Sequence, residues 1–257
     1  MDTAPQLYLD LMKKVLANVI YEDEPLAYEH VPIPWFQGQP VYDPERRRAG
    51  LDWPSRAHTM VGLARLDNVQ SCMEQVVADG VPGDFIETGV WRGGVCILMR
   101  AFLKVHQIDD RRVWVADSFQ GLPEVGPYGH PLDVRLGLHR ANNVLAIPLA
   151  AVQANFARYG LLDDQVQFLP GWFRDSLPNA AIERLAILRL DGDLYESTMD
   201  ALTHLYSKLS PGGFVIVDDY ALRSCRRAID DFRERYGIDD PVAPIDGASA
   251  YWRRAHY

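Results

Sequence analysis

The chain has 257 residues, of which 48% are hydrophobic and 24% charged, and its formal net charge is −9. This length suits one large α/β domain, or one domain with an appended N-terminal region, and the composition is that of an ordinary soluble globular protein. The negative charge would repel the phosphates of nucleic acids and anionic membranes, so we expect neither as a partner.

The cysteines and the N-terminus indicate the compartment. Cys72, Cys96 and Cys225 are widely spaced and form no C-x-x-C pair, which argues against a disulfide framework or a zinc site. The N-terminus has acids at Asp2 and Asp10 and lacks the apolar block of a signal peptide. No apolar run approaches the roughly 20 residues that span a bilayer. The sequence therefore predicts a cytoplasmic protein with reduced thiols.

Residues 1–54 are predicted to form an N-terminal region of their own. Apolar residues at helical spacing predict an amphipathic helix over Gln6–Ile20. Residues 21–54 are rich in proline and aromatic residues, including Trp35 and Phe36, and are too apolar for a disordered linker. We interpret them as an irregular layer packed on the core, as a cover over an active site, or as part of a subunit interface. The last of these would suit a homo-oligomer, a dimer or larger.

Beyond residue 54, strands and helices alternate. Helical spacing runs from Pro54-Ser55 to about Asp79. Five strands are expected, at Phe85–Glu87, Val113–Ala116, Val166–Leu169, Leu185–Leu190 and Gly213–Val217. Helices are expected at Val95–Val105, Pro148–Tyr159, Ser197–Leu209 and Arg223–Tyr236. This alternation predicts an α/β fold over residues 55–257, with a doubly wound, mostly parallel sheet covered by helices on both faces.

The turn after the first strand can admit a ligand close to its backbone. Its sequence, GVWRGG (Gly89–Gly94), lacks the G-x-G-x-x-G fingerprint of dinucleotide sites and the Gly-Lys-Ser/Thr ending of a phosphate loop. Glu87, at the tip of the strand, would repel a pyrophosphate and attract a cation. Because S-adenosylmethionine carries an ammonium and a sulfonium but no phosphate, the turn favours a methyl donor over a nucleotide. Trp91 could pack on that cofactor or simply wedge the turn against the core.

The second strand ends at Asp117, and a long interval without a clear strand follows at Gly121–Pro148. A carboxylate after this strand can accept the ribose hydroxyls of an adenosyl ligand, in NAD and S-adenosylmethionine alike. An insertion of this length at the carboxyl end of a strand is typical of a lid or binding loop, and we expect a lid. Its His130 and His139 could contact substrate or be solvated.

Acids stand at the ends of four of the five expected strands: Glu87, Asp117, Asp191 and the pair Asp218-Asp219. Ligands bind outside the carboxyl ends of parallel strands, although some of these acids could instead cap the following helices. Asp191, Asp218 and Asp219 should meet on neighbouring strands, where like charges need a cation or shared protons. Oxygen ligands suit a hard ion, magnesium first and manganese or calcium next, which could lower the pKa of a substrate hydroxyl. Asp191 or Asp193 could then accept its proton.

Five ordered motifs stand out along the chain: ETGVWRGG (Glu87–Gly94), DSFQGLP (Asp117–Pro123), GWFRDSLP (Gly171–Pro178), LDGDLYEST (Leu190–Thr198) and PGGFVIVDDY (Pro211–Tyr220), with RAHTM (Arg56–Met60) before them. Together these motifs resemble the macrocin O-methyltransferase family, metal-dependent enzymes that methylate sugar hydroxyls on antibiotics. Length and character also resemble the rhamnose-methylating enzymes of calicheamicin biosynthesis.

The resemblance implies a seven-stranded S-adenosylmethionine-dependent methyltransferase fold, with the lid formed by residues 1–54 and 121–148. It implies Mg²⁺ at Asp191, Asp218 and Asp219, with Asp191 the favoured base and Asp193 the alternative. It implies that the acceptor is a glycosylated small molecule. The implied cofactor-binding residues are Met60, Glu87, Thr88, Gly89, Val90, Trp91, Arg92, Gly93, Asp117, Ser118, Gly171, Trp172 and Asp175.

The sequence leaves two alternative functions. One is an NAD-dependent oxidoreductase or epimerase on the same kind of sheet, against which the missing glycine fingerprint and Glu87 count. The other is a non-catalytic S-adenosylmethionine-binding protein, against which the intact acids count. Among isolated residues, Arg46–Arg48 is expected to be an exposed basic cluster, and Tyr195 could face the acceptor or pack at the start of its helix.

Overall fold

The structure is a computed structural model that describes residues 3–27, 31 and 41–255. Part of the proline- and aromatic-rich segment, with Trp35 and Phe36, lies outside these described residues. Among the described residues, every helix falls short of the length and apolar character that crossing a bilayer requires.

A seven-stranded sheet forms the centre of the molecule, in the order β3-β2-β1-β4-β5-β7-β6. The five strands from β3 to β5 in this order run parallel, and β7 pairs antiparallel with both β5 and β6. The strands are β1 (Asp84–Thr88), β2 (Val113–Asp117), β3 (Val166–Pro170), β4 (Leu185–Leu190), β5 (Leu209–Val217), β6 (Ala243–Pro244) and β7 (Ala250–Arg253). The predicted doubly wound, mostly parallel α/β fold is confirmed, and all five expected strands are present.

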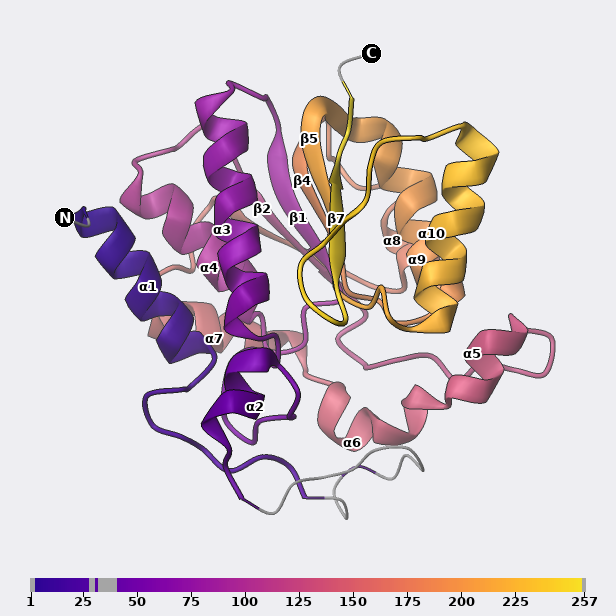
Figure 1. Cartoon of the computed structure of the whole chain (residues 1–257), viewed down its shortest axis with the longest axis horizontal. Helices are drawn as coiled ribbons and strands as arrows, with labels where there is room; N and C mark the ends of the chain where they lie inside the picture. The colour runs from indigo at the N-terminus through magenta and orange to yellow at the C-terminus, as the bar shows by residue number, and fades with distance from the viewer. Residues whose placement is uncertain (1–2, 28–30, 32–40, 256–257) are drawn as a thin grey trace.

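Helices cover both faces of this sheet. Figure 1 shows α3 and α4 on one side and α9 and α10 on the other, with α1 packed outside α4. The main helices are α1 (Ala4–Leu16), α2 (Pro44–Ala49), α3 (Leu63–Ala78), α4 (Gly94–Val105), α7 (Leu149–Arg158), α8 (Phe173–Ser176), α9 (Tyr195–Leu205) and α10 (Arg223–Tyr236). The interval after β2 holds α5 (Pro131–Leu136), the 3-10 turn η2 (Leu138–Ala141) and α6 (Asn142–Leu145), and a second 3-10 turn, η3 (Tyr206–Lys208), follows α9.

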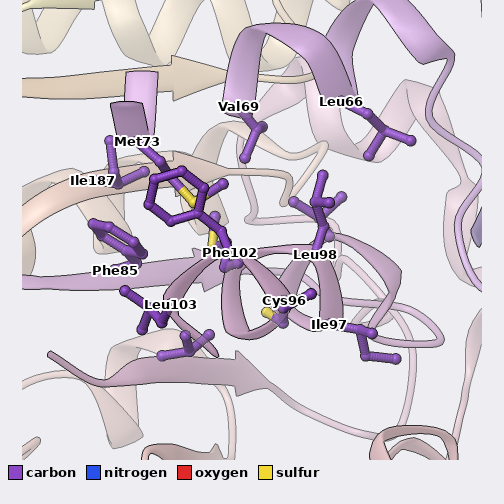
Figure 2. Close-up of a cluster of buried hydrophobic side chains, with 14 of the residues drawn as sticks. Leu66, Val69, Met73, Phe85, Cys96, Ile97, Leu98, Phe102, Leu103 and Ile187 are labelled. Carbon is purple, nitrogen blue, oxygen red and sulfur yellow. The ribbon is translucent and has the colours of Figure 1, made fainter. Parts of the chain in front are cut away.

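Alternate residues of the strands supply the two apolar cores. On β1, the side chain of Phe85 enters the core shared with α3 and α4, whereas Ile86 enters the core shared with α9 and α10. Figure 2 shows Phe85 packed with Phe102 and Leu103 of α4 and with Met73 of α3. Both faces of the central strands are buried, as their near-continuous apolar sequences require.

The helical stretch predicted from Pro54-Ser55 was wrong at its start, because α3 begins at Leu63. The amide groups of His58 and Thr59 donate to the carbonyl of Leu16, 2.9 and 3.3 Å away, so they make no bonds within a helix. This segment instead joins α1 to the core. The helix predicted to Ile20 also ends earlier, at Leu16, and Asn18 then adopts a left-handed φ of 53°.

The expectation that Arg46–Arg48 is wholly exposed was wrong for its central residue. The Arg47 side chain is 2% exposed. It pairs with Asp23 at 2.7 Å and with both carboxylate oxygens of Asp52 at 2.9 Å. Asp23 also accepts bonds from the amides of Arg56 and Ala57. A buried ion-pair cluster therefore holds together the described part of the N-terminal region. It also fixes the segment at residues 56–57, which precedes the cavity residue Met60.

Candidate active site

A cavity of about 650 Å³ opens at the carboxyl ends of β1, β2, β4 and β5. It includes the junction of β1 and β4, from which the strand order continues in opposite directions. Its lining includes these predicted site residues: Met60, Glu87, Gly89, Val90, Trp91, Asp117, Ser118, Gly171, Trp172, Asp191, Asp193, Asp218 and Asp219. Residues distant in sequence thus meet at one pocket, as the acids at the strand ends predict.

The turn after β1 is fixed by close backbone packing. Gly89 has a φ of +89°, and a Cβ atom on it would lie 1.8 Å from the carbonyl oxygen of Asp191. Only glycine fits there, because that contact involves backbone rather than a side chain that could move. The turn after β1 and the acid motif after β4 are therefore in direct contact.

Asp117 fastens this turn to the one after β2. Its Oδ2 accepts from the amide of Val90 at 2.8 Å, and its Oδ1 accepts from the amide of Phe119 at 2.7 Å. Burial raises the pKa of Asp117, while these backbone bonds act in the opposite direction. The carboxylate expected to face a ribose thus has a structural task as well.

Four predicted cofactor residues lie outside the cavity lining: Thr88, Arg92, Gly93 and Asp175. Thr88 donates to the carbonyl of Arg189, and the Arg92 guanidinium donates to the carbonyls of Ala57 and Pro54. Asp175 has a side chain 65% exposed and pairs with Arg174. Arg92 therefore holds the segment that leads to Met60, a role that the linear motif does not show.

Trp91 joins the turn to the insertion after β2. Its indole lines the cavity, and its Nε1 donates to the carbonyl of Val144 in α6 at 3.0 Å. The guanidinium of Arg92 lies 4.0 Å from the centre of the same ring. Leu122, Leu138 and Leu145 of the insertion also line the cavity.

Three carboxylates converge at the other side of the cavity. Asp191, Asp218 and Asp219 each offer one oxygen, and these oxygens all lie within 4.8 Å of one another. Burial and the neighbouring Asp218 raise the pKa of Asp191 to about 6. Burial and nearby acids raise the pKa values of Asp193 and Asp219 well above the usual range. The amide of Asp193 donates to Asp219 at 3.0 Å, which ties the ends of β4 and β5 together.

Two buried arginines accompany these acids, and the sequence analysis assigned no role to either. Arg189 of β4 has a fully buried side chain that pairs with Glu87, Asp191 and Asp218. Arg65 of α3 pairs with Asp218 and Asp246, both at 2.7 Å. The sequence does indicate a buried ion pair at Arg189, because this arginine stands inside an apolar strand and a charge there needs a buried partner. Arg65 has no such signal in its helical surroundings.

Glu87 lies on the cofactor side of the same network. Its side chain is 2% exposed, pairs with Arg189 and accepts from the thiol of Cys96 at 2.9 Å. Burial raises its pKa to about 7, although Arg189 opposes this shift. Through Arg189, the predicted cofactor acid and the predicted metal acids belong to one connected site.

The donor set fits a hard divalent cation. Five acids (Glu87, Asp191, Asp193, Asp218, Asp219) face two arginines, so the cluster retains an excess of negative charge when they are ionised. The three oxygens lie within 4.8 Å of one another, and ligands of an octahedral ion bound at about 2.1 Å are separated by roughly 3 Å when adjacent and roughly 4 Å when opposite. All are carboxylate oxygens, which suit magnesium, manganese or calcium better than zinc.

Comparison with known proteins gives consistent matches over nearly the whole chain. A family model described as macrocin-O-methyltransferase (TylF) matches residues 5–254. The 8-demethyl-8-(2,3-dimethoxy-alpha-L-rhamnosyl)-tetracenomycin-C 4'-O-methyltransferase of Streptomyces olivaceus is 61% identical over 252 residues, covering 98% of this chain and 94% of that protein. The solved structure of the O-methyltransferase NovP is 52% identical with a TM-score of 0.92, covering 98% of this chain and 100% of that one. The calicheamicin methyltransferase CalS11 is 22% identical with a TM-score of 0.57, covering 98% of this chain and 94% of that one, a likeness that shows the fold alone.

Proposed function

Because the chain belongs to the macrocin O-methyltransferase (TylF) family, we propose that it methylates a sugar hydroxyl of a glycosylated natural product. The methyl donor is S-adenosylmethionine, and the reaction depends on Mg²⁺. The observation that supports this most is the convergence of Asp191, Asp218 and Asp219 in the cavity that the Gly89–Trp91 turn also lines.

The residues of the site divide the work of methyl transfer. S-adenosylmethionine bound at the turn would supply an electrophilic methyl group, and a divalent cation held by Asp191, Asp218 and Asp219 would lower the pKa of the sugar hydroxyl. The hydroxyl oxygen would then bond to the methyl carbon, and the electron pair of the carbon–sulfur bond would leave with sulfur. Asp191 accepts the hydroxyl proton. Burial and neighbouring acids raise the pKa of Asp191 to about 6 and that of Asp193 well above the usual range, which favours Asp191 as the base.

We also propose that the N-terminal region and the 121–148 insertion cover the acceptor. From the described part of the N-terminal region, Leu51, Asp52 and Trp53 line the cavity, and Leu122 and Leu138 line it from the insertion. These are mainly apolar surfaces, which suit the ring of a deoxysugar or an aglycone. The acids between them suit hydroxyl groups.

The first test is calorimetric titration of the wild-type protein with S-adenosylmethionine and, separately, with NAD, both with Mg²⁺. We expect binding of S-adenosylmethionine alone, because ten acidic residues and two arginines line the cavity and would oppose a pyrophosphate. Binding of NAD alone would contradict the proposal. The acceptor is tested with 8-demethyl-8-(2,3-dimethoxy-α-L-rhamnosyl)-tetracenomycin C, the compound in the name of the S. olivaceus relative, by mass spectrometry for one added methyl group.

The metal requirement is tested by chelation. Removing divalent ions with EDTA should lower methyl transfer by at least about 100-fold, because a bound cation contributes several kcal/mol to charge stabilisation. Excess Mg²⁺ should restore the rate. In parallel, calorimetry should show Mg²⁺ binding to the wild type and its loss in Asp219→Asn. An undiminished rate in EDTA would contradict the metal assignment and leave the methyl donor unaffected.

A further inference from the structure

The insertion after β2 contacts the beginning of α9 at its far end. Asp133 of α5 is 1% exposed. Its Oδ1 accepts from the amide of Tyr195 at 2.7 Å, and its Oδ2 accepts from the amide of Glu196 at 3.1 Å. Tyr195 and Glu196 are the first two residues of α9. Both carboxylate oxygens of a buried acid are thus used on one helix terminus.

Helix α9 needs this contact because its own sequence supplies no cap. The residue at its N-cap is Leu194, whose hydrocarbon side chain accepts no hydrogen bond. The first amides of a helix have no partner within it, and a carboxylate there satisfies them and complements the helix dipole. Asp133 therefore caps α9 from a position 62 residues earlier in the chain.

Two further contacts hold the same pair of residues. The ring of His130 stacks on that of Tyr195, with centroids 3.8 Å apart and an angle of 8° between their planes. The amide of His130 donates to Oε1 of Glu196 at 3.1 Å. Residues 130–133 of the insertion are therefore docked on the first turn of α9, on both its backbone and its side chains.

That first turn forms one wall of the cavity. Glu196, Ser197 and Asp200 line it, and α9 begins two residues after Asp193. A shift of the turn would therefore move both this wall and the acid motif. Asp133 lies behind the wall, outside the residues that line the cavity.

The other end of the insertion is attached separately, to the cofactor side. Besides the bond from Trp91 to Val144, the side chain of Asn142 accepts from the amide of Leu122 at 2.9 Å and donates to its carbonyl at 2.8 Å. This Asn142–Leu122 pair closes the base of the insertion. The cofactor turn is thus held without the help of Asp133.

We propose that Asp133 is a positioning residue for the reaction, which sets the acceptor wall of the site by capping α9 in place. The proposal rests on the proposed function in one respect, namely that the molecule bound against this wall is the acceptor of methyl transfer. Loss of Asp133 loosens the acceptor side and leaves the cofactor side as it is.

The experiment compares Asp133→Ala and Asp133→Asn with Arg135→Ala, an exposed position on the same short helix. Hydrogen exchange is measured by mass spectrometry with S-adenosylhomocysteine and Mg²⁺ present. In Asp133→Ala, amides at 195–200 should exchange about tenfold faster, as expected for a lost cap, and those of β1 and α4 should be unchanged. Asp133→Asn keeps one carbonyl oxygen, so its exchange rate at 195–200 should lie between those of the wild type and Asp133→Ala. If the alanine variant fails to fold, Asp133→Asn alone is compared with the wild type. Unchanged exchange at 195–200, or faster exchange spread over the whole sheet, would overturn the proposal.

Binding and kinetics then separate positioning from loss of folded protein. The dissociation constant of S-adenosylhomocysteine should stay within about twofold of wild type, while the KM for the tetracenomycin acceptor rises about tenfold. A merely structural role would lower the active fraction and leave both constants unchanged. If the wild type methylates no acceptor, the proposed function fails, and the exchange data still decide the role of Asp133.

Discussion

Asp191→Asn is expected to lower methyl transfer by at least about 10³-fold while the protein stays folded. The substitution removes the proposed proton acceptor and one of three metal ligands, and general base catalysis alone contributes about 10²–10⁴-fold. Stability should be unchanged or slightly higher, because Asp191 is only partly exposed and lies near Asp218, and both effects raise its pKa, to about 6. Arg189 retains Glu87 and Asp218 as partners in the variant.

The measurement is single-turnover methyl transfer with thermal unfolding in parallel. Asp230→Asn is the matched control, since its side chain is 55% exposed on α10 and lies outside the residues that line the cavity. Asp193→Asn, compared at the same pH, separates the two possible bases, and we expect the smaller loss from it. Turnover by Asp191→Asn within tenfold of wild type would remove both the metal and the base assignment of this residue.

Arg189→Met is expected to lower the free energy of unfolding by about 3–5 kcal/mol, the usual cost of removing one partner from a buried ion pair. The Arg189 side chain is fully buried and contacts three carboxylates. Without it, Glu87, Asp191 and Asp218 would either remain charged against one another or take up protons. Methionine fills a similar volume, so the decrease in the free energy of unfolding would come from the lost charge rather than from a cavity.

Urea unfolding checks this prediction, with Arg226→Met as the control. The Arg226 side chain is 59% exposed, and its pair with Asp230 measures 3.9 Å, so its removal should cost less than about 1 kcal/mol. Added Mg²⁺ should recover part of the stability of Arg189→Met, because a cation can replace some of the missing charge. A loss below about 1 kcal/mol in Arg189→Met would show that the acids are neutral in the folded protein.

The sheet and the acids at its edge could be predicted from the sequence because both depend on local patterns. Each strand is a short apolar run, and each of the acids Asp117, Asp191 and Asp218 stands at or just after the end of such a run. Parallel strands bring their carboxyl ends to one edge of the sheet whatever their order. The meeting of these acids could therefore be predicted without knowing the strand order.

The rest depended on contacts between distant segments. Arg47 belongs to a run of three arginines that suggests exposure, yet its side chain is buried and pairs with Asp23 and Asp52. Residues 55–62 have helical spacing, but the amides of His58 and Thr59 bond to the carbonyl of Leu16 instead. The cap of α9 comes from Asp133, in a segment without a recognisable motif. None of these partners is fixed by spacing along the chain.

The Asn142–Leu122 pair has a consequence for engineering this enzyme. It closes the base of the insertion tightly: a Cβ atom on the adjacent Gly121 would lie 2.3 Å from the Asn142 amide oxygen. Residues 123–141 are thus a module with a defined pair of junctions, and the proposed cofactor turn after β1 is attached to the sheet by other contacts. Chimaeras that exchange this module between relatives, together with the first turn of α9 on which it rests, would transfer acceptor preference as a unit. Exchange of the module alone would separate Asp133 from the helix terminus that it caps.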